Sequence, residues 1–188
     1  MNPTLDCREL MQTELLGRSA SAAAMADPLR PLLASLLAGR SLQQGVLSST
    51  LGLAPTDFEV LCEDYFPGDT VLLQNGPGED IVEHDDLLQL LLEYRAGARA
   101  SEAWLAQIVA YACSGRNHLW QDLGLANRAE LSQLMNDAFP GLAQLNRGDM
   151  KWKKFIYRHY CARDGIYVCP APSCSECVDY GKCFAKED

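Results

Sequence analysis

The chain has 188 residues and a formal net charge of −9, with 48% apolar and 22% charged residues. This balance is typical of a folded protein that buries one core and argues against disorder. The acidic balance also argues against nucleic acid as the main partner, because phosphate contacts need a basic surface. No apolar run approaches the roughly 20 residues of a membrane span, and the alanine-rich stretch at 20–26 lacks the features of an export signal. We therefore expect a cytoplasmic protein without a membrane partner.

Apolar residues recur at intervals of three and four along most of the chain, a spacing that predicts α-helices. Thr56 with Glu59 and Asn127 with Glu130 have the spacing of capping boxes, and Ser101 is a candidate N-cap. Stretches of alternating β-branched residues are nearly absent, so the sequence predicts an all-α helical bundle. The predicted helices cover residues 29–38, 41–50, 56–65, 84–96, 101–113, 127–138 and 148–162.

Two segments of the chain resemble each other. Residues 51–68 read LGLAPTDFEVLCEDYFPG and residues 123–141 read LGLANRAELSQLMNDAFPG. Each contains a predicted helix of similar length between a Leu-Gly-Leu-Ala turn and a Phe-Pro-Gly end, which favours an internal helix–turn–helix duplication. We expect a helical domain over 1–163, with a flexible joint near 17–28, and a C-terminal cluster-binding segment over 164–188 packed on it.

Four of the eight cysteines are grouped near the C-terminus, as Cys169-x4-Cys174-x2-Cys177-x5-Cys183. Two prolines and a glycine between them let the backbone turn tightly around one point. Thiolates are soft ligands that select iron–sulfur clusters, zinc or cuprous copper. We therefore predict a metal centre in this cysteine-rich loop rather than disulfides, which are rare in a reducing cytosol.

The spacing of these cysteines favours iron–sulfur over zinc. Cys174 and Cys177 form one tight pair, whereas structural zinc sites usually have two. The first three cysteines share the C-x4-C-x2-C spacing of plant-type ferredoxins, although the fourth is close rather than distant. An iron–sulfur cluster, of [4Fe–4S] or [3Fe–4S] type, is thus favoured, and zinc stays an alternative.

A basic island lies directly before these cysteines. Residues 147–164 hold six of the sixteen Lys and Arg residues and two aspartates, a net charge of +4 that leaves −13 for the rest of the chain. In the predicted helix over 148–162, Trp152, Phe155, Ile156 and His159 share one face by their spacing. This predicts an aromatic stripe in the core, with cations near the cluster or an anionic ligand.

Such cations would offset the negative charge of a cluster held by four thiolates. A solvated charged face is the plainer alternative. The candidates for this compensation are Lys151, Lys153, Lys154 and Arg158.

The sequence on both sides of the basic island contains motifs that point to a protein family. Residues 150–158 read MKWKKFIYR, Cys161 follows them, and Phe184 comes directly after the last of the four grouped cysteines. Upstream, residues 117–125 read NHLWQDLGL and Phe139-Pro140 ends the next predicted helix. Over roughly residues 100–184, these features together resemble the NifQ proteins of nitrogen fixation.

This resemblance implies a molybdenum carrier. NifQ-type proteins hold a molybdenum–iron–sulfur cluster and supply molybdenum for assembling the iron–molybdenum cofactor of nitrogenase. The resemblance implies that Cys169, Cys174, Cys177 and Cys183 are the cluster ligands. It also implies that the partners are a molybdenum source, such as molybdate, and the nitrogenase cofactor-assembly proteins.

Three further residues are candidate metal ligands. Cys161 stands eight residues before the first grouped cysteine and is a spare thiolate, for example for molybdenum. His118 and His159 carry imidazoles, which are competent ligands for transition metals. The alternatives are a buried helix cysteine and two packed or capping histidines.

The sequence contains no nucleophile–base pair, phosphate loop or nucleotide fingerprint, which favours a carrier and donor over an enzyme. Two other functions stay open at this point. One is a one-electron carrier with an ordinary iron–sulfur cluster, and the other is a zinc-stabilised helical interaction module.

Overall fold

The computed structural model describes residues 3–68 and 84–163 of the chain. These residues form ten α-helices and no strand, so the predicted all-α class is confirmed for this part of the chain. The helices are α1 (Pro3–Gly17), α2 (Ala22–Met25), α3 (Arg30–Ser41), α4 (Pro55–Tyr65), α5 (His84–Glu93), α6 (Ser101–Ala112), α7 (Leu119–Asp122), α8 (Arg128–Ala138), α9 (Pro140–Leu145) and α10 (Trp152–Arg163).

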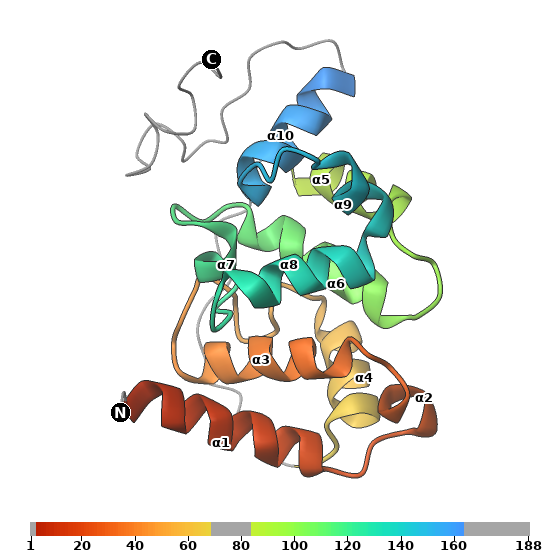
Figure 1. The fold of residues 1–188 in the computed structure, drawn as a ribbon. Coiled ribbons are helices and arrows are strands. Elements are labelled where there is room, and N and C mark those ends of the chain that lie inside the picture. Colours follow the sequence, from red (N-terminus) through yellow and green to blue (C-terminus); the bar gives the residue numbers. More distant parts are fainter. Residues whose placement is uncertain (1–2, 69–83, 164–188) are drawn as a thin grey trace.

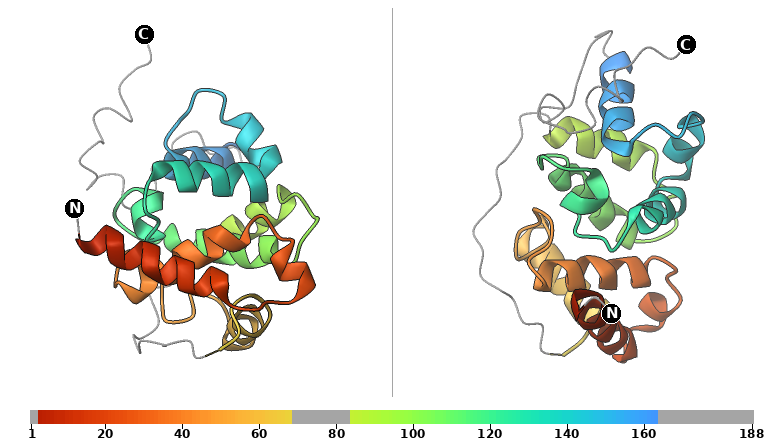
Figure 2. Two further views of the ribbon diagram at one scale, coloured as in Figure 1. Left: turned by 60° about the horizontal axis from the view of Figure 1, so that its bottom comes forward. Right: turned by 60° about the vertical axis from the view of Figure 1, so that its left-hand side comes forward.

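The helices are arranged in two layers (Figures 1 and 2). α1 to α4 form one layer, in which α1 runs alongside α3, and α5 to α10 form the other, in which α5 packs against α6 and α10. Leucines of both layers form one continuous core, and Leu33 and Leu36 of α3 and Leu105 of α6 are fully buried. Burying each such side chain contributes about 1.5–3 kcal/mol, so this core is the main stabilising feature.

A buried carboxylate links the two layers. Asp27, which is 5% exposed, accepts hydrogen bonds from Tyr65 Oη at 2.7 Å and from Ser101 Oγ at 2.6 Å. Burial, with the hydrogen bond to Asp27 as the next cause, raises the pKa of Tyr65 to about 12. Asp27 follows α2 within residues 17–28, where the sequence indicates a flexible joint, and Ser21 in this stretch caps α2 by accepting from the Ala24 N–H at 3.2 Å.

The two similar sequence segments have similar local structures. α4 and α8 each have 11 residues and follow a Leu-Gly-Leu-Ala turn in which the glycine has a positive φ, +87° at Gly52 and +67° at Gly124. Each helix ends at a fully buried phenylalanine, Phe66 or Phe139, with ψ of 54° or 56°. Their origin by duplication stays a prediction.

Six of the seven predicted helices are present, and one is wrong. Of the predicted residues 41–50, Ser41 ends α3, and residues 42–50 form turns and bends instead of a second helix. The chain there adopts positive φ at Gln43 (57°) and Gly45 (80°), and the Val46 N–H donates to Asp122 O at 2.8 Å. The backbone of this turn is thus bonded to the other layer, which outweighs the helical spacing of its apolar residues.

Two predicted helix starts are also wrong. α4 begins at Pro55 after Ala54, so Thr56 is not its N-cap, because a proline suits the first helical position. Ser101 already lies inside α6, and its hydroxyl donates to Asp27 instead of capping. The Asn127 cap of α8 is confirmed, since its side chain accepts from the Glu130 N–H at 3.1 Å.

The last described helix, α10, begins four residues later than predicted. Asn146 accepts from the Met150 N–H and donates to Met150 O, both at 2.9 Å, and this closes a turn. Asp149 in that turn has a φ of +48°, which a continuous helix excludes. α1, α2, α7 and α9 are present in addition to the predicted helices.

Candidate metal centre

The four grouped cysteines, Cys169, Cys174, Cys177 and Cys183, lie outside the described residues. Their ligand role therefore stays a prediction. Within residues 3–68 and 84–163, no group of three or more His, Cys, Asp or Glu side chains is placed to hold a metal ion. The part of the candidate centre that the structure describes is α10, which ends six residues before the first of these cysteines.

An apolar face anchors α10 in the layer formed by α5 to α10. Trp152, Phe155 and Ile156 are buried, as the predicted aromatic stripe requires, and Tyr157 is buried beside them. The rings of Trp152 and Phe155 meet edge to face with centroids 6.0 Å apart. This packing fixes the helix that leads into the cysteine-rich segment.

Lys153 belongs to the interior of the fold. Its side chain is 9% exposed, and its ammonium group forms an ion pair with the fully buried carboxylate of Asp122 in α7. The same group donates to Gly115 O at 2.7 Å and to Asn117 O at 3.1 Å. Lys153 thus neutralises a buried carboxylate and ties α10 to the loop before α7.

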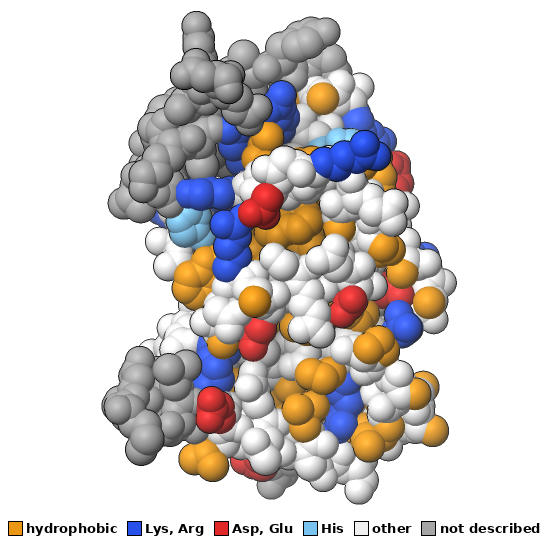
Figure 3. Space-filling model, viewed as in Figure 1, with side chains coloured by type: hydrophobic (Ala, Val, Ile, Leu, Met, Phe, Trp, Pro, Cys, Tyr) orange, Lys and Arg blue, Asp and Glu red, His pale blue; other side chains and the backbone are white. Residues whose placement is uncertain are grey.

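The other predicted cations, in α10 or directly before it, lie nearer the surface. Lys151 and Lys154 are partly buried, and Arg158 is exposed and forms no ion pair within the described residues. Lys and Arg side chains gather on the upper part of the face in Figure 3, together with histidine. This side of α10 therefore carries positive charge in a chain whose net charge is −9.

His159 packs between two aromatic rings. It stacks on Phe155 at a centroid distance of 5.8 Å and meets Tyr94 edge on at 5.4 Å. Its Nε2 lies 3.0 Å from Tyr94 Oη. Burial, and after it the charge of Arg163, lowers the pKa of His159. A metal bound at Nε2 would displace Tyr94, so this geometry favours packing over ligation.

Cys161 is buried, with 2% exposure, two residues further along α10. Positions two residues apart on a helix point about 200° apart, so Cys161 and His159 lie on nearly opposite faces. They cannot both be ligands of one metal centre while α10 keeps this form. The structure thus separates two of the predicted additional ligands.

His118 lies close to the beginning of α10. It is the N-cap residue of α7, it is partly buried, and its backbone N–H donates to Gln121 Oε1 at 3.2 Å. The preceding residue, Asn117, accepts from Lys153. The structure therefore brings His118 and the basic end of α10 into one neighbourhood.

A comparison with protein families is decisive for the identity of the chain. The family model described as NifQ matches residues 32–185. The chain belongs to the NifQ family. The match includes α4 to α10 and continues through all four grouped cysteines, whereas α1 and α2 precede it. The family match confirms the resemblance that the sequence indicates. NifQ proteins take part in nitrogen fixation.

Several NifQ proteins are similar to this chain over most of its length. Protein NifQ of Klebsiella pneumoniae is 38% identical over 149 residues, and the match covers 75% of this chain and 89% of that protein. Protein NifQ of Rhodobacter capsulatus is 36% identical over 144 residues, 76% of this chain and 80% of that protein.

Protein NifQ of Azotobacter vinelandii is 48% identical over 105 residues, 56% of this chain, and the similarity spans about half (54%) of that protein. No solved structure matches the chain. Among the described helices, none has the length and apolar character to cross a membrane.

Asp122 is the residue of this NifQ chain that sequence reasoning did not identify. It is fully buried and, besides pairing with Lys153, accepts from the Asn117 N–H at 3.1 Å. A bare Asp in NHLWQDLGL gives no sign of burial, because its partner lies 31 residues away.

Proposed function

We propose that this NifQ chain is a carrier that binds molybdenum in an iron–sulfur cluster and donates it for assembly of the nitrogenase iron–molybdenum cofactor. The observation that carries the proposal is the quartet Cys169, Cys174, Cys177 and Cys183 within the matched residues 32–185. Four thiolates are a suitable donor set for iron, because soft sulfur ligands select iron–sulfur clusters. The cluster and its molybdenum are the cargo of the carrier, which acts without catalysing a reaction.

The described residues support this proposal through the charge and rigidity of α10. Its buried aromatic face and the Lys153–Asp122 pair hold the helix in place six residues before Cys169. Lys154 and Arg158 lie nearer the surface and are the cations that offset the negative charge of the cluster. Lys153 is left out of this role, because Asp122 already neutralises it.

Metal analysis of anaerobically purified protein, from cells grown with molybdate, tests the proposal. We expect iron, sulfide and molybdenum together, with the visible absorption of an iron–sulfur chromophore. Replacing the four grouped cysteines by alanine removes all three, whereas the matched control Cys7→Ala, at an exposed cysteine in α1, keeps them.

Other metal contents decide against the proposed role. Iron and sulfide without molybdenum, with reversible reduction, would identify a one-electron carrier. Zinc in a colourless protein would identify a zinc-stabilised interaction module. Molybdenum that never leaves the carrier when cofactor-assembly proteins of the same organism are added would contradict donation.

The reduction potential of the cluster tests the charge compensation. Arg158→Gln and Lys154→Gln each remove a positive charge and make the potential more negative, because the reduced cluster carries more negative charge. Arg128→Gln is the matched control, since Arg128 is exposed and already paired with Asp149 at 3.1 Å. Equal potentials in all three variants would show that α10 does not compensate the cluster.

A further inference from the structure

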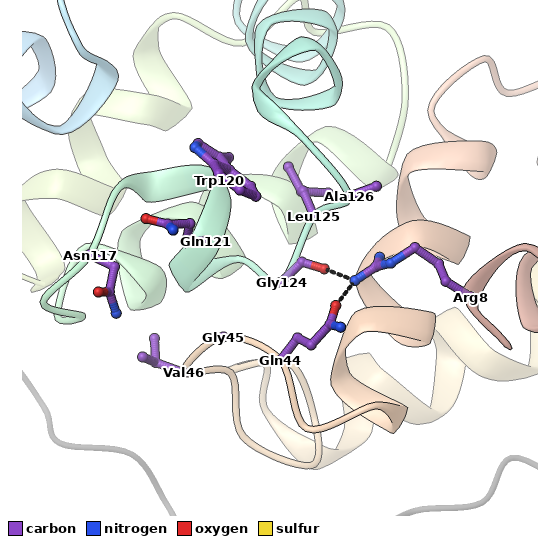
Figure 4. Close-up of a pocket in the computed structure, with 10 residues that line it drawn as sticks. All are labelled: Arg8, Gln44, Gly45, Val46, Asn117, Trp120, Gln121, Gly124, Leu125 and Ala126. Carbon is purple, nitrogen blue, oxygen red and sulfur yellow. Dashed lines mark hydrogen bonds between the residues drawn. The ribbon is translucent and has the colours of Figure 1, made fainter. Parts of the chain in front are cut away.

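A cavity of about 440 Å³ lies where α7 faces the first layer of helices. Arg8 of α1 and Gln44 and Val46 of the turn after α3 line one side, and Asn117, Trp120 and Gln121 of α7 and its preceding loop line the other (Figure 4). Its volume is within the range of small-molecule sites.

The polar groups of this cavity are those that bind anions. Among the described residues, one guanidinium and three side-chain amides line it, and none of the lining residues is a carboxylate. The carboxylate of Asp122 on the same short helix is engaged by Lys153. In a chain with a net charge of −9, such a lining makes the cavity locally positive.

Arg8 is buried without a carboxylate in contact. It is 3% exposed, and its guanidinium donates to Ser35 O at 3.1 Å, to Gly124 O at 2.7 Å and to Gln44 Oε1. Within the described residues no carboxylate lies within ion-pair distance of it. Glu130 is linked to Arg8 only through Ser35 Oγ, which donates to Glu130 at 2.7 Å and accepts from Arg8 at 3.3 Å.

Neutral acceptors compensate a buried guanidinium incompletely. Burial lowers the pKa of Arg8, and the charge of Glu130 only partly opposes this. A charged acceptor forms hydrogen bonds to a guanidinium that are roughly twice as strong as those of neutral acceptors. An anion at the cavity wall would therefore improve the surroundings of Arg8.

We propose that this cavity binds a tetrahedral oxyanion, held by the Arg8 guanidinium and by the side-chain amides of Gln44 and Gln121. An oxygen of the anion takes the place of Gln44 Oε1 at Arg8, and Gln44 turns its NH₂ group to the anion. Gln121 Oε1 accepts from the His118 N–H, which leaves the Gln121 NH₂ group as a donor. The binding of an oxyanion is independent of the proposed function. The choice of molybdate as the oxyanion used in the cell rests on that function.

The variant Gln44→Glu separates this proposal from a purely structural role of Arg8. The new carboxylate has the shape of the amide that already contacts Arg8, so it forms an internal ion pair and occupies the anion's place. The variant therefore folds with an unfolding temperature no lower than that of the wild type. Gln133→Glu on α8 is the matched control, because Gln133 is exposed and the substitution makes the same change in net charge.

Isothermal titration with molybdate, sulfate and phosphate on the full-length protein, with iron content determined in each sample, measures binding. We expect molybdate to bind the wild type and Gln133→Glu equally, and Gln44→Glu about tenfold or more weakly, at unchanged iron content. Gln121→Leu, which keeps Arg8 charged, weakens binding by several-fold. Sulfate and phosphate have the same tetrahedral shape, so they separate general oxyanion binding from a preference for molybdate.

Two results would overturn the proposal: an absence of binding of all three oxyanions to the wild type, and full binding by Gln44→Glu. Binding of sulfate or phosphate as tight as that of molybdate would refute only the assignment to molybdate. Failure of the carrier function is distinct, because it is read from the molybdenum content of the purified protein and not from added oxyanion.

Discussion

Residues 51–66 and 123–139 have nearly the same local structure in different surroundings. Both consist of a turn with a positive-φ glycine, an 11-residue helix and a buried phenylalanine. The residue before the turn differs. Thr50 in the first segment donates to Leu53 O at 2.8 Å within its own turn, whereas Asp122 in the second is the buried partner of Lys153 in α10. One polar side chain thus connects the second segment to the helix that precedes the predicted cluster ligands.

The largest difference between the segments should follow from Lys153→Met. This variant leaves the Asp122 carboxylate buried and unpaired, which costs about 3–5 kcal/mol of unfolding free energy. The matched change in the first segment, Thr50→Val, removes two partly buried hydrogen bonds, with Leu53 O and with Ser48 Oγ, and costs about 1–2 kcal/mol. Urea unfolding followed by circular dichroism measures both values.

A second substitution in the same pair tests whether the unpaired buried charge causes the loss of stability. Adding Asp122→Asn to Lys153→Met removes the buried charge and should recover part of the loss. If Lys153→Met costs no more than Thr50→Val, the ion pair does not distinguish the two segments.

The glycines of the two turns should be about equally sensitive. A Cβ at Gly52 would lie 2.5 Å from Tyr111 Cγ, and one at Gly124 would lie 2.6 Å from Gln44 O. Gly52→Ala and Gly124→Ala each combine this overlap with left-handed backbone strain, and together these effects cost about 2–4 kcal/mol.

Gly97→Ala is the control for these two variants. Gly97 also has a positive φ, +76°, but a Cβ there has nothing within 4 Å. It should therefore cost about 1–2 kcal/mol from backbone strain alone. Chemical unfolding of the three variants separates overlap from strain, and equal losses would show that the close contacts relax.

The sequence predicts local features of these segments better than their connections. Helical spacing and the Asn127 cap are properties of a few neighbouring residues, and the structure contains both. The roles of Ser101 and Lys153 depend on Asp27 and Asp122, which are far away in the sequence, so a local pattern could not identify them. The predicted helix over 41–50 is wrong for the same reason, because Val46 is bonded to the other layer.

The candidate centre was predictable in part. The spacing of the grouped cysteines and the family resemblance are read directly from the chain, and the family is confirmed. The burial of Lys153 was not predictable, because a lysine in a basic helix ordinarily faces solvent. The separation of Cys161 from His159 follows from helix geometry once both residues are known to lie in α10.

The helix caps should give a smaller difference between the two segments. Asn127→Ala removes the hydrogen bond to the Glu130 N–H and costs about 1 kcal/mol. The first segment has no side-chain cap, because the exposed Ala54 precedes α4 with an extended ψ of 145°. Ala54→Asn should therefore stabilise the protein by about 0.5–1 kcal/mol in thermal or urea unfolding. A destabilising Ala54→Asn would show that the two helix starts are not equivalent.

The smallest expected effect is the pH dependence of stability that His159 of α10 causes. Burial lowers the pKa of His159, so the unfolded chain binds a proton at this histidine more readily than the native protein does. The stability that neutral His159 contributes is present above its ordinary pKa of about 6.5 and is lost as pH falls from there through the lowered native value. The unfolding temperature of the wild type should therefore decrease more between pH 7.5 and pH 5 than that of His159→Asn. Parallel curves for the two proteins would mean that His159 binds its proton equally well in the native and the unfolded state. Its burial against Tyr94 would then not disfavour the protonated form.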